Sequence, residues 1–222
     1  MNALVIGGTG AVGQAVCSAL RCRVAFTYRT REGEAMRLAS RLGDALPLPL
    51  DLGSMVDIER VVDRVASDFG GLDAFVHCAG VAPESEWDPL MAVHAKSAFF
   101  GARRAAGAMR RGGNIVFVGA LDAVKPVPTP PPHAGSKAAL AGVTRAMAKE
   151  WGPRNVRVNM VAPGLLDEGI SLSLPEKTRN EYLEHCGLRR FGKTSEVASV
   201  VAWMALENTY VTGQILTLDG AL

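Results

Sequence analysis

Residues 4–13, LVIGGTGAVG, decide the fold of this chain. Three apolar residues precede a turn rich in glycine, and a run of helical composition follows it. Glycines at a strand-to-helix turn let backbone amides approach a pyrophosphate, and the helix N-terminus favours its negative charge. The stretch therefore predicts a nucleotide-binding loop, with an ordinary turn as the alternative. The predicted contacts are Gly7, Thr9, Gly10, Val12 and Gly13.

Short apolar runs alternate with helical patterns along the rest of the chain. Runs of strand length occur at residues 4–6, 24–27, 46–50, 72–76, 115–118, 156–161 and 215–218. The patterns between them predict helices near 11–20, 33–42, 54–69, 89–111, 134–151 and 195–206. Continuous apolar runs suit parallel strands buried on both faces, and the alternation implies right-handed crossovers. We predict a single α/β domain over residues 1–222, a doubly wound Rossmann fold of about seven parallel strands with helices on both faces.

Composition narrows the class of protein. The chain has 222 residues and a net charge of +2, with both signs spread along it, so nothing indicates nucleic-acid binding. The four cysteines lack metal-ligand spacing and favour a reducing compartment: Cys17, Cys22, Cys78 and Cys186. No charged leader and no bilayer-length apolar run is visible. We expect a soluble cytoplasmic protein without a metal, a nucleic-acid partner or a membrane partner.

The end of the second strand indicates which dinucleotide binds. A carboxylate there would bind the ribose 2′-OH of NAD, whereas an arginine pairs with the 2′-phosphate of NADP. This chain has Arg29 and Arg31 and no acid before Glu32, which favours NADP(H) with Arg29 as a contact. Arginines on a solvated loop are the alternative. At the end of the third strand, Asp51-Leu52 is placed to meet the adenine amino group.

Two segments interrupt the alternation of strands and helices. Residues 124–132 hold five prolines in nine positions, which predicts a stiff, polyproline-like loop that delivers His133 to the next helix, or simply a surface loop. Residues 165–190 are polar, with one helical piece around 176–185, and they follow Pro163-Gly164 at a strand end. Ligands of doubly wound sheets bind beyond the carboxyl ends of the strands, so this segment is a candidate substrate lid.

The whole chain resembles the short-chain dehydrogenase/reductase family, and within it the 3-oxoacyl-carrier-protein reductases most closely. The similar segments occur in order and at family spacing: the glycine loop, Asp51-Leu52, Cys78-Ala79-Gly80, residues 113–118, 137–140, 158–164, 190–192, 196–198 and 210–220. The resemblance implies an NADP(H)-dependent reductase acting on a small-molecule or carrier-bound acyl substrate. It also adds cofactor contacts at Ala79, Gly80, Lys137, Pro163 and Gly164.

The resemblance fails at the catalytic positions. In the family, a Tyr hydroxyl protonates the substrate carbonyl, a Lys lowers the pKa of that Tyr and holds the nicotinamide ribose, a Ser holds the substrate oxygen, and an Asn supports a water relay. By alignment these positions are His133, Lys137, Ala120 and His94, so only the Lys remains. The family also often has Gly at Ala11, and a cofactor-binding Thr is displaced by the acids at 167–168.

Three functions remain open for this altered site. Imidazole can donate a proton near neutral pH, so His133 could replace the Tyr of a carbonyl reductase, with Lys137 and His94 completing the catalytic set. Alternatively, His133 and His94 act as acid and base in a non-redox dehydratase or cyclase. The third function is a catalytically silent subunit that stabilises an active relative in a mixed oligomer. Either histidine could also be purely structural.

Small residues recur on two of the predicted helices and indicate how the chain could pair with another copy. They are Gly101, Ala105, Ala108, Ala138, Ala141 and Ala148. Small side chains let helices approach closely, so we expect a homodimer or homotetramer. The alternative is that these residues face the sheet.

Overall fold

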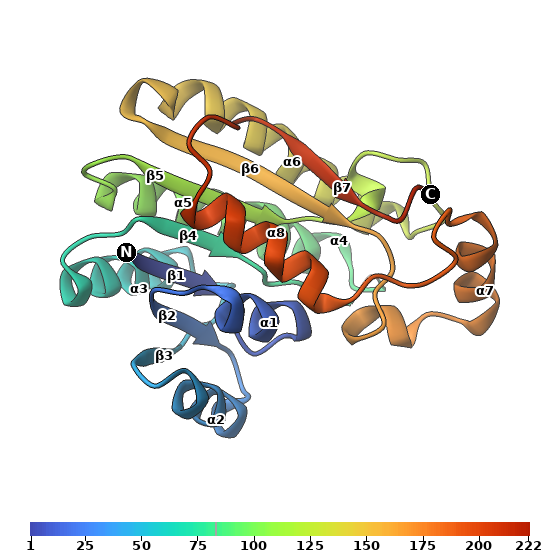
Figure 1. The fold of residues 1–222 in the computed structure, drawn as a ribbon, viewed down its shortest axis with the longest axis horizontal. Helices are drawn as coiled ribbons and strands as arrows, with labels where there is room; N and C mark the ends of the chain where they lie inside the picture. The colour runs from blue at the N-terminus through green and yellow to red at the C-terminus, as the bar shows by residue number, and fades with distance from the viewer. Residues whose placement is uncertain (83) are drawn as a thin grey trace.

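The computed structural model describes residues 1–82 and 84–222. They form a seven-stranded parallel sheet with the order β3-β2-β1-β4-β5-β6-β7 (Figure 1). The strand order reverses between β1 and β4, which is the topological switch point where doubly wound sheets bind ligands. The strands are β1 (Asn2–Ile6), β2 (Arg23–Tyr28), β3 (Ala45–Pro49), β4 (Ala74–His77), β5 (Gly113–Val118), β6 (Val156–Pro163) and β7 (Ile215–Leu218). The predicted fold class is confirmed, and β3 keeps its two prolines because it is an edge strand.

Helices cover both faces of the sheet (Figure 1). One core cluster joins the sheet to α3 (Met55–Phe69), α5 (Ser97–Ala108) and α6 (Pro131–Trp151). The other joins it to α1 (Ala11–Ala19), α2 (Glu32–Leu42) and α8 (Thr194–Leu206). Along β1, Leu4 and Ile6 enter the first cluster while Ala3 and Val5 enter the second. Burial on both faces is why the strands read as continuous apolar runs.

The helix predicted near 89–111 is present as a continuous helical stretch over residues 87–108, with a π turn inside it. It consists of α4 (Trp87–Leu90), a π-helix η1 (Met91–Lys96) and then α5. Within this stretch the hydroxyl of Ser97 donates to Val93 O over 2.7 Å. π turns are rare and occur mostly as single turns inside longer helices, often at functional sites. His94 lies in this turn.

The proline-rich loop is shorter than predicted. Pro131 and Pro132 belong to the first turn of α6, so His133 lies inside that helix rather than before it. A proline fits there because the first helical residues have no intrahelical partner for their N–H groups. A short 3-10 turn, η2 (Leu121–Ala123), links β5 to the remaining loop. A second one, η3 (Gly152–Arg154), follows α6.

Most of the small residues expected at an oligomer interface face the core instead. Gly101 and Ala105 are buried, and a Cβ at Gly101 would lie 2.7 Å from the Phe75 ring. Ala141 and Ala148 are buried as well. These four residues pack within the chain, so they give no support to an interface. Ala138 is exposed and Ala108 half-buried.

The described part of the chain contains no helix long and apolar enough to cross a membrane. Its four cysteines are unbridged.

Candidate active site

A cleft of about 1480 Å³ lies at the carboxyl ends of the strands. Its lining comes from the glycine loop, the ends of β2, β4, β5 and β6, the proline-rich loop and the segment after β6. Every cofactor and catalytic residue predicted from the sequence lines this one cleft. The structure thus brings together residues from position 7 to position 164 of the chain.

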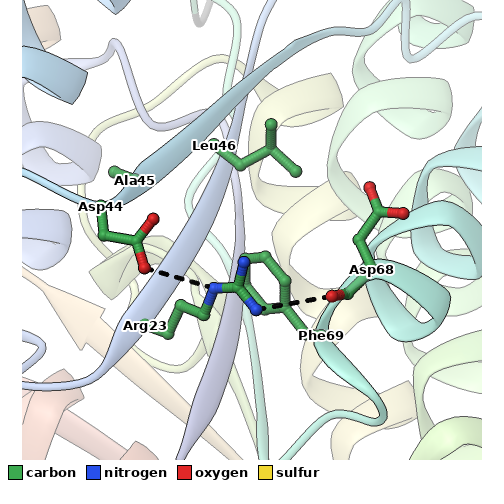
Figure 2. A pocket seen from close by; sticks show the side chains of 6 residues that line it. All are labelled: Arg23, Asp44, Ala45, Leu46, Asp68 and Phe69. Carbon is green, nitrogen blue, oxygen red and sulfur yellow. Dashed lines mark hydrogen bonds and ion pairs between the residues drawn. The ribbon is translucent and has the colours of Figure 1, made fainter.

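A smaller hollow of about 370 Å³ lies at the opposite edge, where β2 and β3 begin (Figure 2). There the guanidinium of Arg23 lies 4.0 Å from the centre of the Phe69 ring and 3.5 Å from an Asp44 oxygen. Exposed ion pairs of this kind contribute little to stability. We assign no chemistry to this hollow.

The glycine loop is shaped by close contacts that only glycine allows. Gly7 has φ of +83°, and a Cβ there would lie 2.8 Å from the backbone of Ala79. A Cβ at Gly13 would lie 2.1 Å from Gly7 O. The Gly7 amide donates to the Thr27 hydroxyl at 3.0 Å, a contact that sequence reasoning missed. The loop therefore holds the N-terminus of α1 against the cleft, as a pyrophosphate site requires.

The end of β2 brings positive charge to the cleft. Arg31 donates to Thr9 O at 3.3 Å and pairs with Glu34 at 3.5 Å, which ties the end of β2 to the glycine loop. Arg29 lines the cleft and is exposed, and it forms no ion pair with a residue that the structure describes. The Asp51 carboxylate accepts from the Gly53 amide at 3.0 Å in a local turn.

His133 is held by a carboxylate. Its Nδ1 lies 2.5 Å from Oδ2 of Asp122, which sits in η2 just beyond β5. The hydroxyl of Thr129 donates to the same oxygen at 2.9 Å. Burial alone would raise the pKa of Asp122, but the bonds from His133 and Thr129 and the charge of Lys137 bring it below its ordinary value. Asp122 is therefore an ionised partner for His133.

From the sequence, Asp122 or His94 could supply the hydrogen bond of the missing family Ser, but the sequence could not place either side chain. The signal available for Asp122 was its position, two residues beyond Ala120, where the family Ser is absent. Ala120 itself carries no polar side-chain atom, so the alignment site of that Ser offers no side-chain hydrogen bond.

His94 is locked between two partners. Its Nε2 accepts from the Val81 amide at 3.2 Å, and its Nδ1 lies 2.9 Å from Ser136 Oγ. Because that hydroxyl donates to His133 O at 2.8 Å, its oxygen accepts from His94. Burial, followed by the charge of Lys137 and of His133, lowers the pKa of His94 far below its ordinary value. His94 is neutral, with both ring nitrogens engaged, and lies edge-on to His133 at 5.3 Å between ring centres.

Lys137 lies one turn after His133 and is 6% exposed. Its Nζ donates to Val118 O at 3.4 Å. Burial lowers the pKa of Lys137 to about 8, a shift opposed by the charges of Asp122 and Cys78. A buried amine at the cleft wall is thus close to its deprotonation point at neutral pH.

His77, at the end of β4, is a buried titratable group that the sequence gave no reason to select. Its Nε2 lies 2.7 Å from Ser97 Oγ, which donates to Val93 O, so the imidazole is the donor. Its Nδ1 has no partner among the described residues. Burial and then the charge of Lys137 lower the pKa of His77 to about 3. Within residues 1–82 and 84–222, no group of three metal-binding side chains is arranged to hold an ion.

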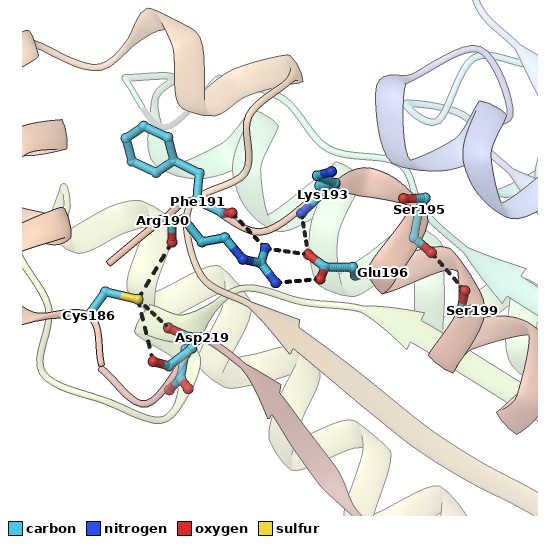
Figure 3. A network of polar contacts seen from close by, with 9 residues as sticks. Cys186, Arg190, Phe191, Lys193, Ser195, Glu196, Ser199 and Asp219 are labelled. Carbon is cyan, nitrogen blue, oxygen red and sulfur yellow. Dashed lines mark hydrogen bonds and ion pairs between the residues drawn. The ribbon is translucent and has the colours of Figure 1, made fainter. Parts of the chain in front are cut away.

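The segment after β6 closes one side of the cleft. It contains the 3-10 helix η4 (Gly169–Ser173) and α7 (Glu176–His185), which confirms the helix predicted near 176–185. Figure 3 shows how its far end is anchored: Arg190 binds Glu196 through two contacts of 2.8 and 2.6 Å. The Cys186 thiol lies 3.4 to 3.6 Å from the backbone carbonyl oxygens of Arg190, Asp219 and Gly220, and it donates its one hydrogen to one of them. The segment is therefore fastened to α8 and to the end of β7.

With this geometry in place, comparisons with known proteins identify the class. The family model described as Enoyl-(Acyl carrier protein) reductase matches residues 10–222. The chain belongs to the short-chain dehydrogenase/reductase family. The 3-oxoacyl-(acyl-carrier-protein) reductase FabG of Thermotoga maritima is 36% identical over 191 residues, which cover 81% of this chain and 78% of that protein. Nodulation protein G of a Rhizobium species is 30% identical over 235 residues, covering 100% and 96%.

Solved structures agree with this assignment. A short-chain dehydrogenase/reductase from Serratia marcescens is 32% identical, with a TM-score of 0.91 over 99% of this chain and 96% of that one. A short chain dehydrogenase from Burkholderia cenocepacia, solved in complex with NADP, is 29% identical with the same TM-score and coverage.

Proposed function

We propose that this protein is an NADP(H)-dependent carbonyl reductase of the ketoacyl type in which His133 replaces the family Tyr as proton donor. The observation that carries the proposal is the position of His133. It lies in the first turn of α6, one turn before Lys137, in the same cleft as the glycine loop. Its Nδ1 binds Asp122, so Nε2 is the nitrogen left to meet a substrate.

The residues that line the cleft suit NADP(H). The glycine loop and the N-terminus of α1 would hold the pyrophosphate, because a Cβ at Gly7 or Gly13 would fill the space that the loop needs. Arg29 and Arg31 would meet the 2′-phosphate, and Asp51-Leu52 the adenine. Ala79, Gly80, Pro163 and Gly164 complete the lining on the nicotinamide side, and Lys137 would bind the ribose. When bound, the nicotinamide supplies the hydride; the relatives solved with NADP support this assignment.

His133 would move the proton. In its protonated form, Nε2–H donates to the carbonyl oxygen of the substrate, and Asp122 stabilises the positive charge on the ring. Because Ala120 has no hydroxyl, His133 takes over the hydrogen bond that the family Ser makes to the substrate oxygen.

His94 would support the site rather than exchange protons. Its two hydrogen bonds hold Ser136 on α6 and the Val81 backbone at the cleft wall. Proton uptake at Nε2 would break the bond from Val81. This argues against a dehydratase or cyclase that needs both histidines as acid and base.

We further propose that residues 165–190 act as the substrate lid. Ile170, Leu174 and Tyr182 line the cleft from this segment, and Val127 lines it from the proline-rich loop. Apolar walls at this end suit the acyl chain of a small or carrier-bound substrate. The FabG relative is named for a carrier-bound substrate, which supports this class. We keep the proposal of a homodimer or homotetramer, and sedimentation at micromolar concentration giving only monomers would contradict it.

Oxidation of NADPH in the presence of an acetoacetyl thioester tests the reductase. Wild type should turn over, and His133→Ala should lose about a hundredfold or more in kcat while still binding NADPH. An unchanged rate in His133→Ala, with NADPH bound, would overturn the proposal. Wild type that binds NADPH but reduces no ketone would favour the silent subunit, and turnover without cofactor would favour the non-redox enzyme.

A further inference from the structure

We propose that Asp122 is a positioning residue for His133, and that the proline-rich loop holds the Asp122 carboxylate in place through Thr129. The inference rests on the proposed function, because it explains how an imidazole can stand where the family has a phenol. It assigns a role to the proline-rich loop that neither the family resemblance nor the fold assigns.

Asp122 sets the direction of the His133 imidazole ring. A His side chain has two nitrogens on one ring, so a partner at Nδ1 decides where Nε2 lies. Oδ2 of Asp122 lies 2.5 Å from Nδ1, and both side chains are nearly buried, at 5% and 11% exposure. A short bond to a buried carboxylate fixes the Nδ1–H form and favours the charged ring. Without Asp122, either nitrogen could carry the proton of a neutral ring.

The proline-rich loop in turn holds the Asp122 carboxylate. Thr129 donates to the same Oδ2 at 2.9 Å. It lies between Pro128 and Pro130, whose rings fix φ and so restrict the backbone that presents the hydroxyl. Further back in the loop, Nζ of Lys125 donates to Asp219 Oδ2 and to Leu222 O, each at 2.6 Å. The loop is thus fastened at Lys125 and delivers one hydroxyl to the carboxylate.

Three titratable groups from three different elements face His133. Asp122 comes from η2, Lys137 from α6 itself, and His94 from η1. His94 is neutral, so the charged groups near His133 are the carboxylate of Asp122 and the buried amine of Lys137. From α4, the Trp87 ring packs near Gly135 and brings no charge. Removing the carboxylate leaves only groups that disfavour a protonated ring.

Asp122→Asn tests the inference, because the amide keeps the shape of the side chain but not its charge. Thr129→Val removes the second bond and keeps the volume. Asp44→Asn, an exposed position at the opposite edge of the sheet (Figure 2), is the matched control. Proton and nitrogen NMR of the histidine rings in cofactor-free protein reports the tautomer of His133. Initial rates with NADPH and an acetoacetyl thioester across pH report kcat and KM.

Asp122→Asn should abolish the preference for the Nδ1–H tautomer of His133, because the carboxylate that binds Nδ1 is gone. It should reduce kcat about tenfold or more and leave KM for NADPH unchanged. Thr129→Val should change both readouts in the same direction by less, and Asp44→Asn should change neither. Circular dichroism shows whether each variant is folded, and if Asp122→Asn unfolds, Thr129→Val carries the test.

Two results keep this inference apart from the proposed function. If wild type reduces no ketone but Asp122→Asn still changes the tautomer of His133, the reductase fails and the positioning role stands. If the reductase depends on His133 while Asp122→Asn leaves both the tautomer and kcat unchanged, the positioning role is overturned.

Discussion

Replacing His77 by glutamine should make the stability of this protein less sensitive to mild acid. The buried imidazole is fixed as a donor to Ser97, and burial with the nearby charge of Lys137 lowers its pKa from 6.5 to about 3. As the pH falls below 6.5, the unfolded chain binds a proton at His77, whereas the folded chain does not until the pH approaches 3. Acid therefore favours the unfolded state.

The sign and size follow from the depressed pKa. The stability that neutral His77 contributes is complete above pH 6.5 and is lost as the pH falls toward 3. Each pH unit inside the window costs about 1.4 kcal/mol for one histidine. Between about pH 6.5 and about pH 4.5, His77 should lower the free energy of unfolding by about 2 kcal/mol, because the unfolded imidazole is already half protonated at the upper pH. The buried His94, whose pKa is also lowered, acts in the same direction.

Urea unfolding, followed by circular dichroism at these two pH values, measures the effect. The amide nitrogen of His77→Gln keeps the bond to Ser97 without titrating, so this variant should lose about 2 kcal/mol less stability than wild type between the two pH values. His185→Gln replaces an exposed histidine of α7 and should keep the wild-type dependence. The carboxylates titrate alike in all three proteins. Equal pH dependence in wild type and His77→Gln would refute the reasoning.

Three further predictions concern the cleft. Arg29→Asp should weaken binding of NADPH much more than binding of NADH in fluorescence titrations; equal losses would contradict the 2′-phosphate role. Gly13→Ala places a Cβ 2.1 Å from Gly7 O and should cost about 1–3 kcal/mol of stability together with nucleotide binding; calorimetry showing an unchanged midpoint would contradict this. His133→Tyr combined with Ala120→Ser should raise ketone reduction, because the new phenol lies over Lys137 and the new hydroxyl holds the substrate oxygen; a rate below wild type would favour a site adapted to imidazole.

The sheet and the nucleotide loop could be predicted because their signals are local. Continuous apolar runs report burial on both faces, and the glycines report contacts within a single strand-to-helix turn. Gly13 illustrates this: the atom that excludes a side chain there, Gly7 O, is only six positions away. The cleft lining followed from topology, since carboxyl ends of parallel strands meet at one edge.

The partners inside the site could not be predicted, because they depend on packing between distant segments. His94 meets Ser136 across 42 positions, and it does so from a π turn that the sequence did not predict. The Asp122–His133 bond depends on the path of the proline-rich loop, which no periodicity reports. The small-residue pattern on α5 misled for a related reason: Gly101 allows close packing, but the sequence cannot tell whether the partner is the sheet or a second chain.

The altered positions of this site depend on one another. A histidine in place of the Tyr is useful only if its ring is aimed, and Asp122 aims it. A histidine in place of the Asn is harmless beside Lys137 only if it stays neutral, and the bonds to Val81 and Ser136 keep it so. The two imidazoles lie 5.3 Å apart and share Lys137 as a neighbour, but only His133 binds a carboxylate. The ring of His94 is held through both nitrogens, whereas His133 keeps Nε2 free of the contact to Asp122. His133 is therefore the imidazole placed to donate a proton at the cleft.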